Sequence, residues 1–215
     1  AISPLEYIET VKYDPLSIAI LDHALDHPES VMVFAAANNG MNSPSLLALA
    51  PRYAGSDLGN WLSVGALDGS CITRSSGGTL SLSEGAVPWF SNLAGGAERW
   101  TVMAPGSLII SLDASTNGYM SMSGTSMAAP VVSGALALVQ HAYPWMTGKQ
   151  LADAVLTTAD KDFSAPDYIV SFSRETEKIY IRIIDKKIPE PADTAAAKAL
   201  VAQAHNKHPE AWLGY

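Results

Sequence analysis

One serine in this chain lies where a reactive nucleophile could form. Ser126 belongs to the run Ser-Gly-Thr-Ser-Met-Ala-Ala-Pro at 123–130, and an almost wholly apolar stretch follows as far as Pro144. The pattern predicts a buried helix that begins close to Ser126, with Pro130 tolerated in its first turn. At a helix N-terminus, unpaired N–H groups and the helix dipole favour a developing negative charge. A hydroxyl at this position suits nucleophilic attack, once a base removes its proton.

A second candidate follows an apolar run that is typical of a buried parallel strand. The run covers 31–36 and ends in the turn cluster Ala-Asn-Asn-Gly at 37–40. The side-chain amide of Asn38 could donate to the oxyanion of a tetrahedral intermediate, with the N–H of Ser126 as a second donor. Asn39 is the second choice for this role. The alternative is that the cluster is only a turn, because Asn tolerates left-handed conformations.

These two segments resemble those of the subtilases, the subtilisin-like serine proteases. Residues 123–130 resemble their nucleophile motif, and residues 31–40 resemble a strand that ends in Ala-Ala-Gly-Asn-x-Gly. The resemblance implies that Ser126 is the nucleophile and Asn38 an oxyanion-hole donor of a serine endopeptidase that works through an acyl-enzyme. Where the family has glycine before the asparagine, this chain has Ala37, which would tighten the pocket wall.

The resemblance also implies a substrate-binding cleft beside the serine. One wall of the cleft would be Ala35, Ala36 and Ala37, whose small side chains favour an open, apolar pocket. Gly124 and Thr125, which precede the serine, are expected to contact the substrate as well. The opposite wall of the pocket, a Ser-Leu-Gly strand in the family, is expected upstream.

The other two members of the family's catalytic triad are missing from the sequence. Subtilases carry an aspartate in Asp-Ser/Thr-Gly and a histidine in His-Gly-Thr/Ser, but none of the five histidines here precedes glycine. His141 lies about four helical turns from Ser126, too far to be its base. We therefore expect the aspartate and the histidine upstream of Ala1 in the same precursor, or on a separate polypeptide made by cleavage. This chain alone is then expected to be incompetent as a protease.

The elements expected around these residues follow the family order from Asp14 to Thr158. Helices are predicted at 15–27 and 149–158, strands at 61–67, 99–106 and 107–111, and a hairpin at Asn117-Gly118. The long polar stretch 70–96 is expected to be a loop, and it contains Phe90-Ser91-Asn92, which resembles a Phe-Ser-Asn segment of subtilases. The expected fold is α/β: a three-layer subtilisin-like domain with a mostly parallel sheet flanked by helices, incomplete at its N-terminus.

The chain is interpreted in two parts. Residues 1–158 form the C-terminal portion of a subtilase catalytic domain, and residues 159–215 form an insertion that leads to the domain end. The alternative for the second part is a small accessory extension. Within it, residues 168–184 predict a β-hairpin and residues 193–205 predict a helix.

Composition excludes several classes of partner and site. The net charge of −8 argues against nucleic acid and against anionic membrane surfaces. A single cysteine, Cys71, rules out an internal disulfide, and no apolar run reaches the ~18 residues of a membrane span. The resemblance implies protein or peptide substrates and a secreted, cell-surface or periplasmic location. No cofactor is required for the expected reaction; structural calcium is possible in the family, but no acidic cluster here has the spacing of a calcium loop.

Two alternatives to a working protease stay open at this point. In the first, the upstream histidine or aspartate has been lost and the chain is a catalytically dead subtilase-like domain that only binds peptides. In the second, the chain is an α/β scaffold domain whose Gly-Thr-Ser segment is purely structural. An esterase is disfavoured, because no Gly-x-Ser-x-Gly turn surrounds Ser126.

Overall fold

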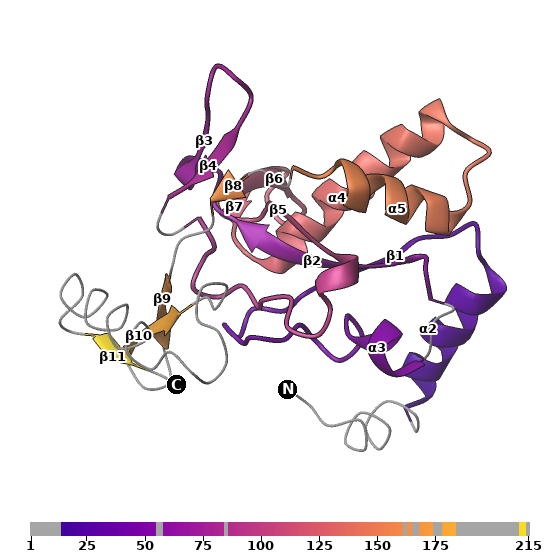
Figure 1. The fold of residues 1–215 in the computed structure, drawn as a ribbon, viewed down its shortest axis with the longest axis horizontal. Helices are drawn as coiled ribbons and strands as arrows, with labels where there is room; N and C mark the ends of the chain where they lie inside the picture. The colour runs from indigo at the N-terminus through magenta and orange to yellow at the C-terminus, as the bar shows by residue number, and fades with distance from the viewer. Residues whose placement is uncertain are drawn as a thin grey trace. The chain divides into compact units, whose positions relative to one another are not determined.

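The computed structural model describes residues 14–54, 58–83 and 86–160, and the backbone of four strands beyond them. These strands are β8 (Phe163–Ser164), β9 (Tyr168–Ser173), β10 (Lys178–Ile183) and β11 (Ala211–Leu213). The chain divides into two compact units (Figure 1). The first unit comprises residues 1–67 and 91–159, and the second comprises residues 68–90 and 160–215.

A three-stranded parallel sheet forms the centre of the first unit. Its strands are β1 (Met32–Ala35), β2 (Trp61–Leu67) and β5 (Thr101–Pro105), with β2 in the middle. All residues of β2 except the last are buried, as expected for a strand that is covered on both faces. Because the strands are parallel, their carboxyl ends meet at one edge of the sheet, the usual place for a site in an open α/β fold.

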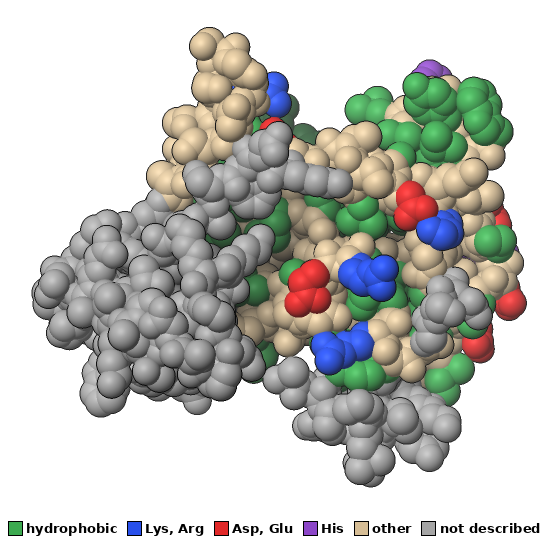
Figure 2. All heavy atoms as spheres, viewed as in Figure 1, with side chains coloured by type: hydrophobic (Ala, Val, Ile, Leu, Met, Phe, Trp, Pro, Cys, Tyr) green, Lys and Arg blue, Asp and Glu red, His purple; other side chains and the backbone are tan. Residues whose placement is uncertain are grey.

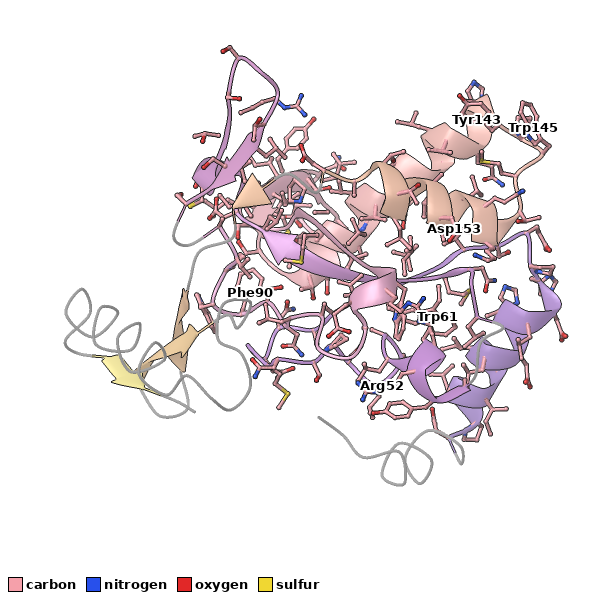
Figure 3. The ribbon with its side chains drawn as sticks, in the orientation of Figure 1. Arg52, Trp61, Phe90, Tyr143, Trp145 and Asp153 are labelled. Carbon is pink, nitrogen blue, oxygen red and sulfur yellow. The ribbon has the colours of Figure 1, made fainter. Side chains whose placement is uncertain are left out.

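Helices cover both faces of this sheet, which confirms the three-layer α/β fold expected from the sequence. Helices α2 (Pro15–Asp26) and α3 (Ala50–Ala54) share a core with Trp61 on one face. Helix α4 (Thr125–Ala142) packs against all three strands, and α5 (Gly148–Thr158) packs against α4. The two helical layers lie on opposite sides of the sheet in Figure 1, and Trp61 is labelled in Figure 3.

Local capping signals set where two of these helices begin. Asp14 caps α2: its carboxylate accepts the backbone N–H of Ser17 at 2.8 Å and the hydroxyl of Ser17 at 2.6 Å. These bonds lower the pKa of Asp14. Thr147 and Gln150 form a reciprocal capping box at the start of α5. Both helices lie within a residue of the ranges predicted from the sequence.

Helix α4 differs from the expected helix in two respects. It begins at Thr125, so Pro130 is its sixth residue rather than part of the first turn. There the proline ring removes the N–H that would otherwise bond to the carbonyl of Ser126. The helix is also not buried all round, because Val131 and Leu138 are 43% and 74% exposed. The prediction of a buried helix was therefore wrong: apolar composition alone does not tell which faces another element will cover.

A β-hairpin leads the chain into the serine segment, as the turn signal at Asn117-Gly118 predicted. Strand β6 (Ile109–Asp113) pairs antiparallel with β7 (Gly118–Met122), and Asn117 takes a left-handed conformation with φ of 59°. Hydroxyls of Thr116 and Ser115 donate to the carboxylate of Asp113 across the turn. These bonds lower the pKa of Asp113 to about 2.

The second unit contains two small sheets. One has the order β3 (Ile72–Arg74), β4 (Leu80–Leu82), β8, and the other has the order β11, β10, β9. The hairpin of β9 and β10 was predicted from the sequence, whereas β3 and β4 lie in a stretch expected to be a loop. The helix predicted at 193–205 lies outside the described residues. The interpretation of 159–215 as an insertion or an extension stays a prediction. Two 3₁₀ helices complete the described elements, Gly69–Cys71 in this unit and Glu98–Trp100 in the first.

Buried polar side chains join these elements. Asn60, which is 4% exposed and directly precedes β2, donates from Nδ2 to the carbonyls of Ala24 at 2.9 Å and Ser30 at 3.0 Å. It thereby joins the end of α2 to the segment that leads into β1. Ser63, in the middle of β2, is the contrasting case, because its buried hydroxyl has no partner in the described part of the chain.

Ser63 and Ser91 form a matched pair for a stability test, because both are fully buried. The hydroxyl of Ser91 accepts the N–H of Ala66 at 3.0 Å and donates to the carbonyl of Asn92 at 3.1 Å. We expect Ser91→Ala to lower the free energy of unfolding by about 1–3 kcal/mol, whereas Ser63→Ala leaves it unchanged or raises it by up to about 1 kcal/mol. Urea denaturation followed by tryptophan fluorescence measures both. Equal losses for the two variants would contradict this account.

Candidate active site

Asn38 and Ser126 approach the carboxyl edge of the sheet from different elements. Asn38 is the third residue after β1, and Ser126 is the second residue of α4. Gly106, directly after β5, accepts the N–H of Gly124 at 2.8 Å. A Cβ at Gly106 would lie 2.7 Å from the Cβ of Ala66, too close for any side chain. Glycine is needed at 106 because the chain before α4 packs so closely on the sheet.

The side chain of Asn38 is oriented by Thr125. Its Oδ1 accepts the backbone N–H of Thr125 at 2.8 Å and the Thr125 hydroxyl at 3.0 Å. A backbone N–H can only donate, so the amide atom that faces it must be the oxygen. The amide nitrogen, Nδ2, is therefore available as a hydrogen-bond donor, and no described residue accepts a hydrogen bond from it. A Cβ at Gly124 would lie 3.3 Å from this nitrogen, so a side chain at position 124 would require the Asn38 amide to shift by a few tenths of an ångström.

Thr125 joins the asparagine loop to α4. Its side chain is 0% exposed, and besides donating to Asn38 its hydroxyl accepts the N–H of Ala37 at 3.2 Å. Sequence analysis expected Thr125 to contact the substrate. The structure buries its side chain completely and gives its hydroxyl these two partners.

Ser126 is exposed at the N-terminus of α4. Among the described residues, neither its hydroxyl nor its backbone N–H has a hydrogen-bond partner. His141 lies in the last turn of the same helix, about 22 Å along the axis at 1.5 Å per residue. The rings of His23 and His27 contact each other in the layer that contains α2, with centroids 4.3 Å apart and planes tilted by 32°. None of these three histidines contacts the serine.

The three alanines before Asn38 differ in their surroundings. Ala36 is 1% exposed; its N–H donates to the carbonyl of Val64 at 2.9 Å, and its carbonyl accepts the N–H of Ser45 at 2.8 Å. Ala35 and Ala37 are partly exposed. Ala37 has a φ of 89°, in the left-handed region that favours glycine. The departure from the subtilase pattern thus places a strained residue directly before Asn38.

The structure distinguishes the two adjacent asparagines that the sequence left as candidates. Both are exposed, but the side-chain amide of Asn38 is oriented by two hydrogen bonds, whereas the recorded bond of Asn39 comes from its backbone N–H, which donates to Asn92 Oδ1 at 2.9 Å. Sequence reasoning gave no role to Asn92, although it noted the Phe-Ser-Asn segment. No periodicity or turn signal connects this residue with a loop more than fifty positions upstream.

Metal binding has no support in the described part of the chain. No group of three or more His, Cys, Asp or Glu side chains there could hold a metal ion. The structural calcium that the family resemblance makes possible stays a prediction, with no site assigned to it. The same residues include no helix of sufficient length and apolarity to cross a lipid bilayer.

The subtilase family model matches residues 9–187 of the sequence. This chain belongs to the subtilase family. The match covers the sheet, α4 and the segments that carry Asn38 and Ser126. It also continues past the boundary expected at 158, into the second unit.

Curated relatives share only part of their length with this subtilase. The chain is 29% identical over 158 residues to Serotype-specific antigen 1 of Mannheimia haemolytica, covering 71% of this chain and 15% of the relative. It is 28% identical over 143 residues to the Neisserial autotransporter lipoprotein NalP of Neisseria meningitidis serogroup B, covering 65% of this chain and 13% of that protein. Subtilisin DY of Bacillus licheniformis is 45% identical over 58 residues, 27% of this chain and 21% of that protein.

Solved structures show the same fold. The S41 Psychrophilic Protease is similar with a TM-score of 0.50 at 23% identity, over 75% of this subtilase and 48% of that chain. The Prenylagaramide maturation protease PagA gives a TM-score of 0.50 at 21% identity, over 70% of this subtilase and 47% of that chain. The chain thus spans about half the length of these structures and a smaller share of the curated relatives.

The strain at Ala37 leads to a stability prediction. We expect Ala37→Gly to raise the free energy of unfolding by about 1 kcal/mol, because glycine adopts a φ of 89° without the Cβ clash. Ala36→Gly is the matched control. Ala36 has no such φ, so the same change there should lower stability by about 0.5–1 kcal/mol. Urea denaturation midpoints report both, and a loss of stability in Ala37→Gly would show that no strain is relieved.

Proposed function

We propose that this subtilase chain carries the nucleophile and one oxyanion donor of a serine endopeptidase. One observation carries the proposal: Thr125 turns the Asn38 amide so that its nitrogen is left to donate, next to an exposed serine at a helix N-terminus. Membership of the subtilase family supports the same function. The substrates are then proteins or peptides, and nucleic acid is not expected as a partner.

The proposed reaction forms an acyl-enzyme on Ser126. The serine Oγ attacks the carbonyl carbon of the peptide bond while its proton passes to a histidine base, and the carbonyl oxygen becomes an oxyanion. The oxyanion accepts hydrogen bonds from Nδ2 of Asn38 and from the backbone N–H of Ser126. The C–N bond then breaks, the histidine gives its proton to the leaving amine, and water hydrolyses the remaining ester. None of these steps needs a cofactor.

The histidine, and the aspartate that orients it, are proposed to come from another segment of the same precursor. Two observations support this. The described histidines do not contact Ser126, and α4 exposes apolar side chains such as Val131 and Leu138. Figure 2 shows apolar side chains gathered around the C-terminal end of α4, where Tyr143 and Trp145 are also exposed. Apolar surface of this kind is typical of an interface with another polypeptide segment.

The substrate pocket is proposed to begin at the alanines before Asn38. Ala35 and Ala37 are partly exposed and could contact a substrate side chain, whereas the buried Ala36 would contribute only through its backbone. Gly124 would leave room for the scissile carbonyl beside the Asn38 amide. Thr125 would act through Asn38, because its side chain is fully buried.

The proposed location is outside the cytoplasm, as a secreted, cell-surface or periplasmic protein. The similarity to a protein named an autotransporter lipoprotein supports this location. Fractionation of cells that express the full natural polypeptide would test it directly.

The nucleophile is tested by covalent labelling. A fluorophosphonate probe should label the full natural polypeptide that contains this chain, and Ser126→Ala should remove the label, because the probe reacts only with an activated serine. Ser123→Ala is the control, since Ser123 lies three residues away with an exposed side chain and should leave labelling intact. Absence of label in the wild-type protein, after any pro-segment has been removed, would favour a catalytically dead peptide-binding domain or a scaffold. Labelling of the 215-residue chain by itself would contradict the proposed external base.

The oxyanion donor is tested by kinetics. We expect Asn38→Ala to lower kcat by about 100- to 1000-fold with little change in KM, because the amide bond strengthens only in the transition state. Loss of the oxyanion-hole asparagine of subtilisin lowers kcat by about this much. Asn39→Ala is the control and should retain kcat. Equal effects of the two substitutions, or a larger effect at Asn39, would overturn the assignment.

A further inference from the structure

We propose that Asn92 is a positioning residue that holds the Asn38 loop in its productive conformation. The inference rests on the proposed function, because it concerns how the oxyanion donor is kept in place. Asn92 is 2% exposed, so it cannot contact a substrate and can act only through the residues around it. No sequence pattern other than the Phe-Ser-Asn segment drew attention to it.

The contacts of Asn92 bracket Asn38 on both sides. Its backbone N–H donates to the carbonyl of Ala37 at 3.0 Å, and its Oδ1 accepts the N–H groups of Asn39 at 2.9 Å and Met41 at 3.0 Å. Its Nδ2 donates to the carbonyl of Ser43 at 3.0 Å. One buried side chain thus satisfies three backbone groups of a loop that lacks a regular ladder, and the backbone satisfies a fourth.

These contacts require an amide at position 92. The side chain must accept from two N–H groups and donate to a carbonyl at once, which Asn does and Asp or Leu does not. The loop also contains Ala37 in a left-handed conformation. A residue in a strained conformation persists only where several surrounding contacts hold it in place. Asn92 supplies such contacts, because it bonds to backbone groups immediately before and after Asn38.

Asn92 is itself anchored to the sheet. Ser91, fully buried beside it, accepts the N–H of Ala66 in β2 at 3.0 Å. The following residues continue along the loop, because Leu93 donates to the carbonyl of Met41 at 2.8 Å and Gly95 to that of Asn42 at 2.7 Å. The central strand, Asn92 and the Asn38 loop therefore form one continuous set of contacts.

Loss of Asn92 should appear in kcat rather than in KM. The Asn38 amide acts on the oxyanion, which exists only in the transition state, and its effect depends on an accurate distance. We expect Asn92→Leu to lower kcat about 10- to 100-fold while KM changes by less than about threefold. Asn92→Asp keeps the acceptors for Asn39 and Met41 but loses the donor to Ser43, so it should lower kcat less than Asn92→Leu does. It also serves as the second variant where Asn92→Leu fails to fold.

Asn60→Leu is the matched control for these measurements. Asn60 is also a buried asparagine whose Nδ2 donates to two carbonyls, but it precedes β2 and so lies at the amino end of the strand. We expect Asn60→Leu to lower the melting temperature. At temperatures where the variant is still folded, its kcat should be unchanged. An equal fall in kcat for Asn60→Leu and Asn92→Leu would show a general structural effect and overturn the inference.

A double-mutant cycle in the full natural polypeptide separates this inference from the proposed function. With Asn38→Ala already present, Asn92→Leu should lower kcat by no more than about twofold, because its effect passes through Asn38. If both substitutions lower kcat and their effects multiply, the positioning role is wrong and the oxyanion role stands. If Asn38→Ala has no effect, the oxyanion role fails, and amide hydrogen exchange then decides whether Asn92 holds the Asn38 loop.

Amide hydrogen exchange gives a readout that does not depend on activity. Asn92→Leu should raise the exchange rate of a peptide covering 38–43 about tenfold or more, because the loop loses three side-chain bonds. Asn60→Leu should leave that peptide unchanged. If the polypeptide shows no protease activity, this comparison alone decides, and unchanged exchange in Asn92→Leu and Asn92→Asp would overturn the inference.

Discussion

The two hydrogen bonds from Thr125 to the amide oxygen of Asn38 are the contact on which the candidate site depends. They join the loop after β1 to the first residue of α4, so that one interaction sets both the asparagine amide and the start of the serine helix. Thr125 is fully buried, so water has no access to this side of the contact, and partial shielding strengthens a hydrogen bond electrostatically. Without this contact, the amide nitrogen would have no fixed direction relative to Ser126.

The rest of the first unit makes that contact possible. Parallel strands bring the ends of β1 and β5 to one edge, and glycines at 106 and 124 allow the serine segment to approach both. The close approach is associated with local strain at Ala37, whose left-handed conformation is disfavoured for a residue with a Cβ. Asn92 offsets that strain by bonding to the backbone before and after Asn38.

Much of this arrangement could be predicted from the sequence, because its signals are local. Asp14-Pro15 predicts the start of α2, the apolar run of β2 matches its bounds, and the segment before Ser126 predicts a helix N-terminus. The contacts that orient the site could not be predicted in the same way. The Thr125–Asn38 bonds connect residues 87 positions apart, and those of Asn92 connect residues about fifty positions apart. Such pairings depend on the tertiary fold, which no local pattern encodes.

The predictions that were wrong also depend on the tertiary fold rather than on local sequence patterns. The apolar composition of α4 predicted burial, but the faces of a helix that become buried are decided by the elements that pack on it. The polar stretch that contains β3 and β4 was expected to be a loop, because strands of only three residues are too short to give a clear periodic signal. Pro130 lies just beyond the first turn of α4 rather than within it, because the helix begins at Thr125.

The most direct test is a crystal structure of the full natural polypeptide after reaction with a peptidyl phosphonate, whose tetrahedral adduct mimics the proposed intermediate. The account predicts phosphorus bonded to Oγ of Ser126, and one phosphonyl oxygen within about 3.1 Å of both Asn38 Nδ2 and the Ser126 backbone nitrogen. It also predicts that Asn38 Oδ1 still accepts from Thr125. An adduct on another residue, or an adduct oxygen turned away from Asn38, would contradict the central claim.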